Sequence, residues 1–179
     1  TDFVEHLFVT NSHNYLMFFT DKGKVYRLKA YEIPELGRTA RGTPIINLIQ
    51  IEQGESVNAV IPVQEFESDR YLFFATRQGV VKKTPLEDYT NIRKGGLIGI
   101  SLRDDDVLID VKLTDGLQEI IMGTAHGMSI RFSEGNVRSM GRSATGVKGI
   151  TLDEQDAVIG MDVVDKELDV LIVTAKGYG

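Results

Sequence analysis

Lysine and arginine, the residue types that contact anionic polymers, are concentrated in three windows of this sequence. Residues 22–41, 77–94 and 127–148 contain 15 of the 20 Lys and Arg residues but only 5 of the 26 Asp and Glu residues. The windows carry a net charge of +10 and the rest of the chain −16, which gives the overall −6. Basic patches repeated along one edge of a fold are the electrostatic pattern of a polyanion-binding surface. Ordinary solvated charge is the alternative, but it does not account for the recurrence of the windows in phase.

Each window begins at, or just after, a turn of the pattern Thr-x-x-Gly that follows a short apolar run. The four turns begin at Thr20, Thr76, Thr124 and Thr174. The steps between them are therefore 56, 48 and 50 residues. A period near 50 residues, built from short apolar runs and glycine turns, is typical of propeller-like arrays of small sheets.

The repeats predict an all-β fold in which each repeat supplies about four antiparallel strands and forms one blade. The approximate repeats are 5–63, 64–113, 114–164 and a partial fourth at 165–179. In the first repeat the expected strands are Tyr15–Phe19, Lys24–Leu28, Ile45–Ile51 and Val57–Val63. The first of these strands is apolar throughout, which predicts burial on both faces. No stretch shows a sustained 3.6-residue apolar period with caps, so we expect little helix.

We find no catalytic motif and no metal-binding motif in the sequence. There is no phosphate loop and no dinucleotide-binding glycine motif, and the histidines lack metal-ligand spacing. Arg93–Gly96 is the nearest approach to a phosphate cradle, but it precedes an expected strand and is interpreted as a basic turn. The acidic run Asp104–Asp106 has counterparts at Glu52/Glu55 and at 153–156, which indicates a solvated acidic rim. A cation site at the run is the alternative.

Composition restricts the class of protein further. There is no cysteine, which excludes disulfides and cysteine-based zinc sites. The longest apolar runs are far shorter than the roughly 20 residues of a membrane helix, and the N-terminus lacks a signal-peptide layout. The chain opens on Thr1 and stops at Gly179, just past the fourth turn, so we expect a fragment of a longer cytoplasmic, bacterial-type protein.

Four longer motifs carry a resemblance to a known family. They are Phe-Thr-Asp-Lys-Gly-Lys-Val-Tyr at 19–26, Gly-Arg-Thr-Ala-Arg-Gly-Thr-Pro at 37–44, Phe-Ala-Thr-Arg-Gln-Gly-Val-Val-Lys-Lys-Thr at 74–84 and Gly-Arg-Ser-Ala-Thr-Gly-Val-Lys-Gly at 141–149. With these motifs, essentially the whole chain resembles the C-terminal domain of the DNA gyrase A subunit, truncated at both ends. That domain is a six-bladed β-pinwheel, of which this chain would form a part.

The resemblance implies a domain that wraps duplex DNA, without sequence preference, around its basic perimeter. It further implies a heterotetrameric holoenzyme with the gyrase B subunit, in which ATP-dependent strand passage introduces negative supercoils. The resemblance implies no catalytic residue, cofactor or metal in this fragment, since the breakage tyrosine, ATP and Mg belong to other parts of the holoenzyme. No membrane partner is implied. The perimeter positions carried over are Lys24, Arg27, Arg38, Arg41, Lys82, Lys83, Arg93, Lys94, Arg131, Arg138, Arg142 and Lys148.

Three alternatives remain open at the level of sequence. The family's Gln-x-Arg-Gly-Gly-x-Gly box is not in this sequence, so the equivalent domain of the topoisomerase IV A subunit is one alternative. A propeller-type scaffold that binds proteins is another, although WD and kelch motifs are absent. A chromatin-type propeller of similar period is the third.

Overall fold

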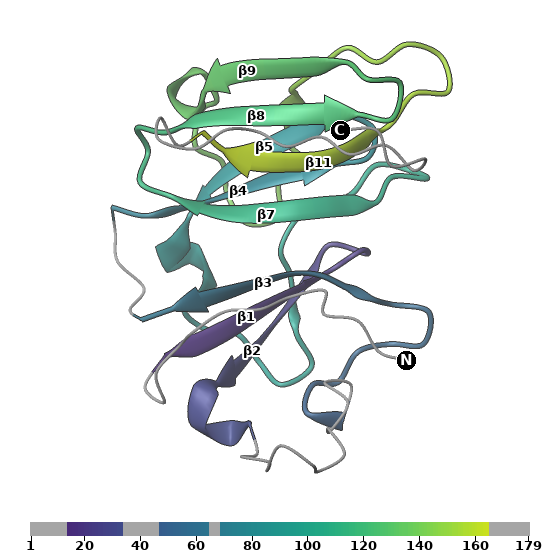
Figure 1. Ribbon diagram of the computed structural model, residues 1–179. Coiled ribbons are helices and arrows are strands. Elements are labelled where there is room, and N and C mark those ends of the chain that lie inside the picture. The colour runs from purple at the N-terminus through teal and green to yellow at the C-terminus, as the bar shows by residue number, and fades with distance from the viewer. Residues whose placement is uncertain (1–13, 34–46, 65–68, 165–179) are drawn as a thin grey trace, which may run out of the picture.

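The computed structural model describes residues 14–33, 47–64 and 69–164 of the chain. These residues form three antiparallel β-sheets that are stacked on one another, with short 3₁₀ turns and no α-helix among them (Figure 1). The expectation of an all-β fold with little helix is confirmed. The 3₁₀ turns are η1 (Ala30–Glu32), η3 (Leu86–Tyr89) and η4 (Glu134–Asn136).

The strands of each sheet alternate in direction, and their spatial order differs from their order in the sequence. The first sheet contains β3 (Val57–Val63), β1 (Tyr15–Thr20), β2 (Lys24–Lys29) and β6 (Leu97–Ile98). The second contains β10 (Val147–Lys148), β5 (Val80–Pro85), β4 (Tyr71–Thr76) and β7 (Leu108–Thr114). The third contains β11 (Val158–Val163), β8 (Glu119–Thr124) and β9 (Ser129–Ser133) within the described residues.

The outer strand of each four-stranded sheet comes from the following repeat. β6 lies in the second repeat but pairs with β2 of the first, so that Lys24 is opposite Ile98. β10 lies in the third repeat but pairs with β5 of the second, so that Val147 is opposite Val81. Each four-stranded sheet therefore takes three strands from its own repeat and one strand from the next repeat. The interpretation of each repeat as one blade did not include this exchange.

The threonine of each of the three described Thr-x-x-Gly turns closes the turn with its side chain. Its hydroxyl oxygen accepts the backbone N–H four residues later, in the pairs Thr20–Lys24, Thr76–Val80 and Thr124–Met128. The glycine N–H donates to the threonine carbonyl, and at Gly79 the backbone adopts φ +88°, which glycine takes without strain. The recurrent motif is thus a recurrent hydrogen-bonded turn between adjacent strands.

The apolar core lies between the stacked sheets. On β4, Leu72 and Phe74 pack toward the first sheet, while Phe73 and Ala75 pack toward the third. The Phe74 ring meets the Phe19 ring edge-on, with centroids 5.6 Å apart. Every residue of β1 after Tyr15 and of β4 after Tyr71 is buried, which confirms the expected burial of Tyr15–Phe19 on both faces, whereas β8 is buried at alternate residues.

Two expected strands differ from the structure. Residues 47–51, the described part of the expected strand Ile45–Ile51, form a turn followed by irregular chain and no strand. In the second repeat, only Leu97–Ile98 of the segment 96–102 is paired as a strand. Leu97–Ile98 lies at the edge of the first sheet, where this short paired stretch attaches the segment to β2 of the preceding repeat.

Candidate nucleic-acid interface

The basic residues predicted to contact a polyanion divide into groups by their exposure. The exposed ones are Arg93, Lys94, Arg131, Arg138 and Lys148, and the half-buried ones are Lys24, Arg27 and Arg142. Lys82 and Lys83 are buried. Arg38 and Arg41 lie outside the described residues. An ammonium or guanidinium group reaches a phosphate only from the surface, so the exposed set is the part of the prediction that remains suited to direct contact.

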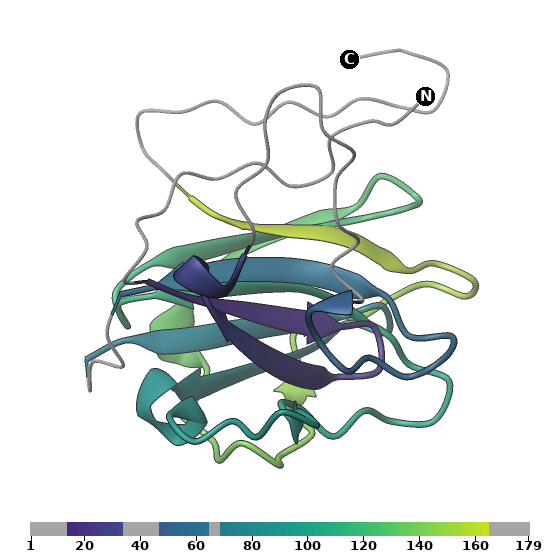
Figure 2. The same ribbon diagram turned by 90° about the horizontal axis from the view of Figure 1, so that it is seen from below.

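Most of the exposed set lies on two chain segments, residues 90–102 and 138–150, which include β6 and β10 and are called the outer edge below. Figure 2 shows the two segments, coloured teal and yellow-green, together at the lower margin of the molecule and away from β11. They are hydrogen-bonded to each other. The Ser101 N–H donates to the Ala144 carbonyl at 3.3 Å, and the Ser101 hydroxyl donates to the Ser143 carbonyl at 2.7 Å. Basic segments from two successive repeats therefore form one joined surface.

Arg27 attaches the first sheet to this edge. Its guanidinium donates to the Thr90 carbonyl at 2.7 Å and lies over the Tyr15 ring, 4.9 Å from the centroid. Thr90 directly follows η3, at the start of the outer edge. The side chain thus fixes the position of the segment that carries Arg93 and Lys94.

Lys82 and Lys83 point inward from β5. The Lys82 Nζ donates to the carbonyls of Gly99, at 2.6 Å, and of Arg142. Burial lowers the pKa of Lys82 to about 7, although the carboxylate of Asp88 opposes this shift. The Lys83 Nζ donates to the Glu134 carbonyl at 3.1 Å. Both lysines therefore serve contacts within the protein.

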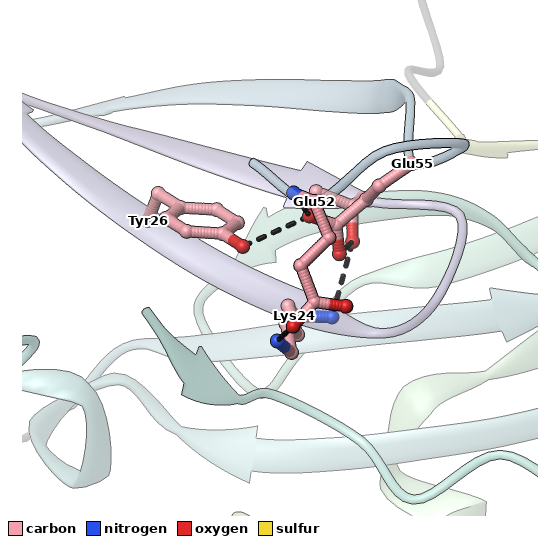
Figure 3. A network of polar contacts seen from close by, with 5 residues as sticks. Lys24, Tyr26, Glu52 and Glu55 are labelled. Atoms are coloured by element: carbon pink, nitrogen blue, oxygen red, sulfur yellow. Dashed lines mark hydrogen bonds and ion pairs between the residues drawn. The ribbon is translucent and has the colours of Figure 1, made fainter. Parts of the chain in front are cut away.

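Two other predicted residues have carboxylate partners. The Lys24 ammonium forms an ion pair with Glu52, and this hydrogen bond raises the pKa of Lys24 (Figure 3). Arg131 forms an ion pair with Glu119 across the β8–β9 pair. Such exposed pairs are weak and exchange readily with a phosphate oxygen.

The hydrogen bonds of three acidic residues with the described Thr-x-x-Gly turns were missed by sequence reasoning, which had placed these acids in a solvated rim. Asp106 accepts the N–H of Gln78 in the second turn at 3.0 Å, and Asp156 accepts the N–H of His126 in the third turn at 3.0 Å. In the first repeat, Glu55 accepts the hydroxyl of Thr20 at 2.8 Å. The signal that could have found these contacts is the spacing of one acid, 30 to 35 residues after each of the first three turn threonines.

The interpretation of these acids as a solvated rim is therefore wrong for part of the set. Glu55 is only 8% exposed and the side chain of Asp156 is fully buried. Burial alone would raise the pKa of Asp156, but hydrogen bonds from Thr124 and from two backbone N–H groups hold that pKa below its ordinary value. The carboxylate is therefore ionised and acts as an acceptor for the turn. Asp104 and Asp105 are exposed, as expected.

The described ranges show neither a metal cluster nor a membrane-spanning helix. Within residues 14–33, 47–64 and 69–164, no group of three or more His, Cys, Asp or Glu side chains is arranged to hold a metal ion. The same ranges contain no helix with the length and apolar character needed to cross a membrane.

Comparison with protein families places the chain among known domains. A family model described as "DNA gyrase C-terminal domain, beta-propeller" matches residues 14–64, 70–115 and 118–165. The DNA gyrase A subunit of Halalkalibacterium halodurans is 62% identical over 150 residues, which is 84% of this chain and 18% of that protein. The DNA gyrase A subunit of Staphylococcus epidermidis is 50% identical over 181 residues, 99% of this chain and 20% of that protein. The chain thus spans about a fifth of the length of these curated relatives.

Solved structures share the fold. The crystal structure of the C-terminal domain of DNA topoisomerase IV has a TM-score of 0.81 and 36% sequence identity, over 88% of this chain and 49% of that one. The structure of the DNA gyrase A C-terminal domain has a TM-score of 0.72 and 27% identity, over 88% of this chain and 50% of that one.

Proposed function

This chain belongs to the DNA gyrase C-terminal domain family, and on that premise we propose that it binds duplex DNA along its outer edge and contributes to DNA wrapping. The observation that carries the proposal is the joining of two basic segments, 90–102 and 138–150, into one surface. Arg93, Lys94, Arg138 and Lys148 lie exposed on these segments. A track of positive charge that continues from one repeat to the next is suited to a phosphate backbone, which is itself a continuous line of negative charge.

The proposed binding does not depend on base sequence. The described residues contain no α-helix, so no recognition helix is available among them to enter the major groove. The outer edge consists instead of turns and two-residue strands that present cationic side chains. Contacts of this kind position a duplex through its phosphates and carry little sequence information.

We place the domain in the A subunit of a bacterial type II topoisomerase that introduces negative supercoils with the energy of ATP. In this proposal its partners in a heterotetramer are the gyrase B subunit, which contributes the ATPase, together with the remainder of the A subunit. ATP and Mg act on those other parts of the assembly and not in this domain. The proposed location is the bacterial cytoplasm, at the nucleoid.

The equivalent domain of topoisomerase IV is the second candidate, because a domain of that enzyme has a TM-score of 0.81 with this chain. The identity of 50–62% to gyrase A subunits, against 36% to the topoisomerase IV domain, favours gyrase. Supercoiling of relaxed plasmid by the full-length protein with its B partner separates the two candidates. Negative supercoils are expected, whereas relaxation and decatenation alone would assign the chain to topoisomerase IV.

DNA binding itself is tested by titrating the chain against a duplex of arbitrary sequence at several salt concentrations. Affinity is expected to fall with salt with a log–log slope of about −0.9 for each phosphate contacted. A second duplex of unrelated sequence should bind equally well. Binding that is indifferent to salt, or restricted to one sequence, would contradict the proposal.

A further inference from the structure

We propose that Lys82 is the positioning residue that holds the basic edge segments of the second and third repeats together. The inference rests on the proposed function, since it assigns to a buried side chain the alignment of the DNA-binding edge. Lys82 lies within the second sheet, on β5, and its side chain is fully buried. It therefore acts on DNA only through the segments that it holds.

The Lys82 ammonium is placed between the two segments of the outer edge. It donates to the Gly99 carbonyl, in the segment 90–102, at 2.6 Å, and to the Arg142 carbonyl, in the segment 138–150. Its Nζ lies 5.0 Å from the centroid of the Phe74 ring, which forms the apolar floor of the site. One nitrogen thus bridges two backbone carbonyls that are 43 residues apart in the sequence.

The same point connects three repeats. The Gly99 N–H donates to the carbonyl of Gly23, in the turn of the first repeat, at 2.8 Å. The Gly99 carbonyl accepts from Lys82 of the second repeat and also from the Tyr89 hydroxyl, at 2.8 Å. Arg142 belongs to the third repeat. A displacement of Lys82 would therefore shift the hydrogen-bonded segments of the preceding and the following repeat.

The strand itself does not require a lysine at this position. The third residue after the turn glycine is Lys82 in the second repeat, Tyr26 in the first and Ile130 in the third. Tyr26 is buried and donates its hydroxyl to Glu55, and Ile130 packs against the apolar core. Burial of an ammonium is unfavourable unless specific acceptors compensate for its lost hydration, so the contacts to the two carbonyls account for a lysine here.

The bridge is compatible with both protonation states of Lys82. Burial lowers the pKa to about 7, opposed by the carboxylate of Asp88 on η3 and reinforced by the Arg142 guanidinium. A neutral amine retains two N–H donors, which is the number that two carbonyls need. The segments therefore stay joined on either side of neutral pH.

The DNA-free test is amide hydrogen exchange of the full chain with the substitution Lys82→Met, which keeps the length and volume of the side chain. The reporter is the Ser101 N–H, because it donates to Ala144 across the two segments. We expect its exchange to become about tenfold faster, as for the loss of one charged hydrogen bond. The Ala125 N–H, which donates to Ala157 at the end of the third sheet, should be unaffected.

The functional test is duplex binding by the same variant over a range of salt concentrations. Affinity should fall about three- to tenfold while the salt slope stays within about 0.3 of the wild-type value, because Lys82 touches no phosphate. Lys112→Gln is the matched control. It removes one cation from β7, at the opposite side of the same sheet, where Lys112 pairs with Asp110. The affinity of the Lys112→Gln variant for duplex DNA should change less than about twofold, because we expect no phosphate contact at Lys112.

Each remaining outcome decides the inference. An unchanged exchange rate of the Ser101 N–H, or an unchanged DNA affinity in a folded variant, would overturn the inference. A salt slope smaller by about 0.9 would also overturn it, because that change indicates that Lys82 contacts a phosphate directly. Lys82→Gln, which keeps amide donors, guards against misfolding of the methionine variant. Unfolding of both variants would make Lys82 a determinant of the fold and overturn the inference. Absence of DNA binding by the wild-type chain would contradict the proposed function and leave the exchange result standing.

Discussion

Thr20 donates its hydroxyl to the buried carboxylate of Glu55 at 2.8 Å, and this bond ties the turn after β1 to the start of β3. In the third repeat the acid Asp156 accepts the N–H of His126, inside the turn that begins at Thr124, at 3.0 Å. In each case the threonine oxygen also accepts the N–H that closes its own turn. Each turn and the later acid are therefore joined by a hydrogen bond, which explains why both recur along the chain.

Replacement of Glu55 by alanine should destabilise the fold by about 2–4 kcal/mol, because the hydroxyls of Thr20 and Tyr26 lose their acceptor inside the protein (Figure 3). Urea unfolding followed by circular dichroism measures the change. Glu52→Ala is the matched control, since Glu52 is exposed and forms only a surface ion pair with Lys24. The control should cost less than about 1 kcal/mol. Equal effects of the two substitutions on the free energy of unfolding would show that the hydrogen bonds to Glu55 do not stabilise the fold.

Gly146→Ala should destabilise the chain by more than about 2 kcal/mol. Gly146 has φ +107°, and an added Cβ would lie 2.4 Å from the Val81 carbonyl oxygen. Gly141→Ala serves as control, because its Cβ would meet no atom within 4 Å. Thermal unfolding compares the two variants. A Gly146 variant as stable as the Gly141 variant would contradict the close approach of β10 to β5.

The stability of the chain should rise with pH above neutrality because of Lys82. Its folded pKa is about 7, against an ordinary 10.5, so the unfolded chain binds more protons between these values. The free energy of unfolding should therefore increase from pH 7 to pH 9, by on the order of 2 kcal/mol. Urea unfolding at both pH values measures the increase, and Lys82→Met should abolish it. An equal increase in that variant would assign the effect to other groups.

Reversal of charge at Arg93 and Lys94 to Glu should weaken duplex binding partially and lower the salt slope by about 0.9 for each phosphate that is no longer contacted. Both side chains are exposed on the outer edge. Lys112→Glu provides the control, because Lys112 lies away from the outer edge. Its side chain lines the groove between β3 and β7, which are the edge strands opposite β6 and β10 in their sheets. Fluorescence anisotropy at several salt concentrations compares the variants. If Lys112→Glu weakened duplex binding as much as the reversal at Arg93 and Lys94, the DNA would not bind along the outer edge.

The isolated chain should bind linear DNA yet produce little superhelical writhe. Smooth bending of a site of 20–30 base pairs costs about 1–6 kcal/mol, which only contacts along a long perimeter can offset. The three sheets of the described residues form a short array, whereas closed propellers typically have about 4–8 blades. Plasmid relaxation by a topoisomerase in the presence of the chain measures the writhe. Full wrapping by the isolated chain would contradict this mechanism.

The sequence was sufficient to predict the turns and the central strands of the three described repeats. The turns that begin at Thr20, Thr76 and Thr124 lie where the motif placed them, and the apolar runs before them form central strands, of which β1 and β4 are buried on both faces. These features depend on neighbouring residues and on a two-sided apolar environment, so the order of the residues encodes them directly.

The pairing of the edge strands and the burial of basic residues could not be predicted in this way. Leu97–Ile98 has the same composition whether it pairs within its own repeat or with β2, and only the stacking of sheets selects β2. Lys82 and Lys83 were expected on the perimeter because the resemblance to the gyrase domain carried these positions over, and a lysine is ordinarily exposed. Their inward direction follows from acceptors contributed by the third repeat, at Arg142 and Glu134, which lie 60 and 51 residues away.

The donation of an outer strand by each following repeat bears on how such arrays grow during evolution. A duplicated unit of about 50 residues supplies an outer strand to the sheet of the preceding unit. The edge of its own sheet accepts the outer strand of the following unit. A new unit therefore fits at any internal junction without a new interface, provided that the copied stretch contains one whole period. Lineages of such proteins can gain or lose repeats by recombination, and the track of positive charge lengthens or shortens with them.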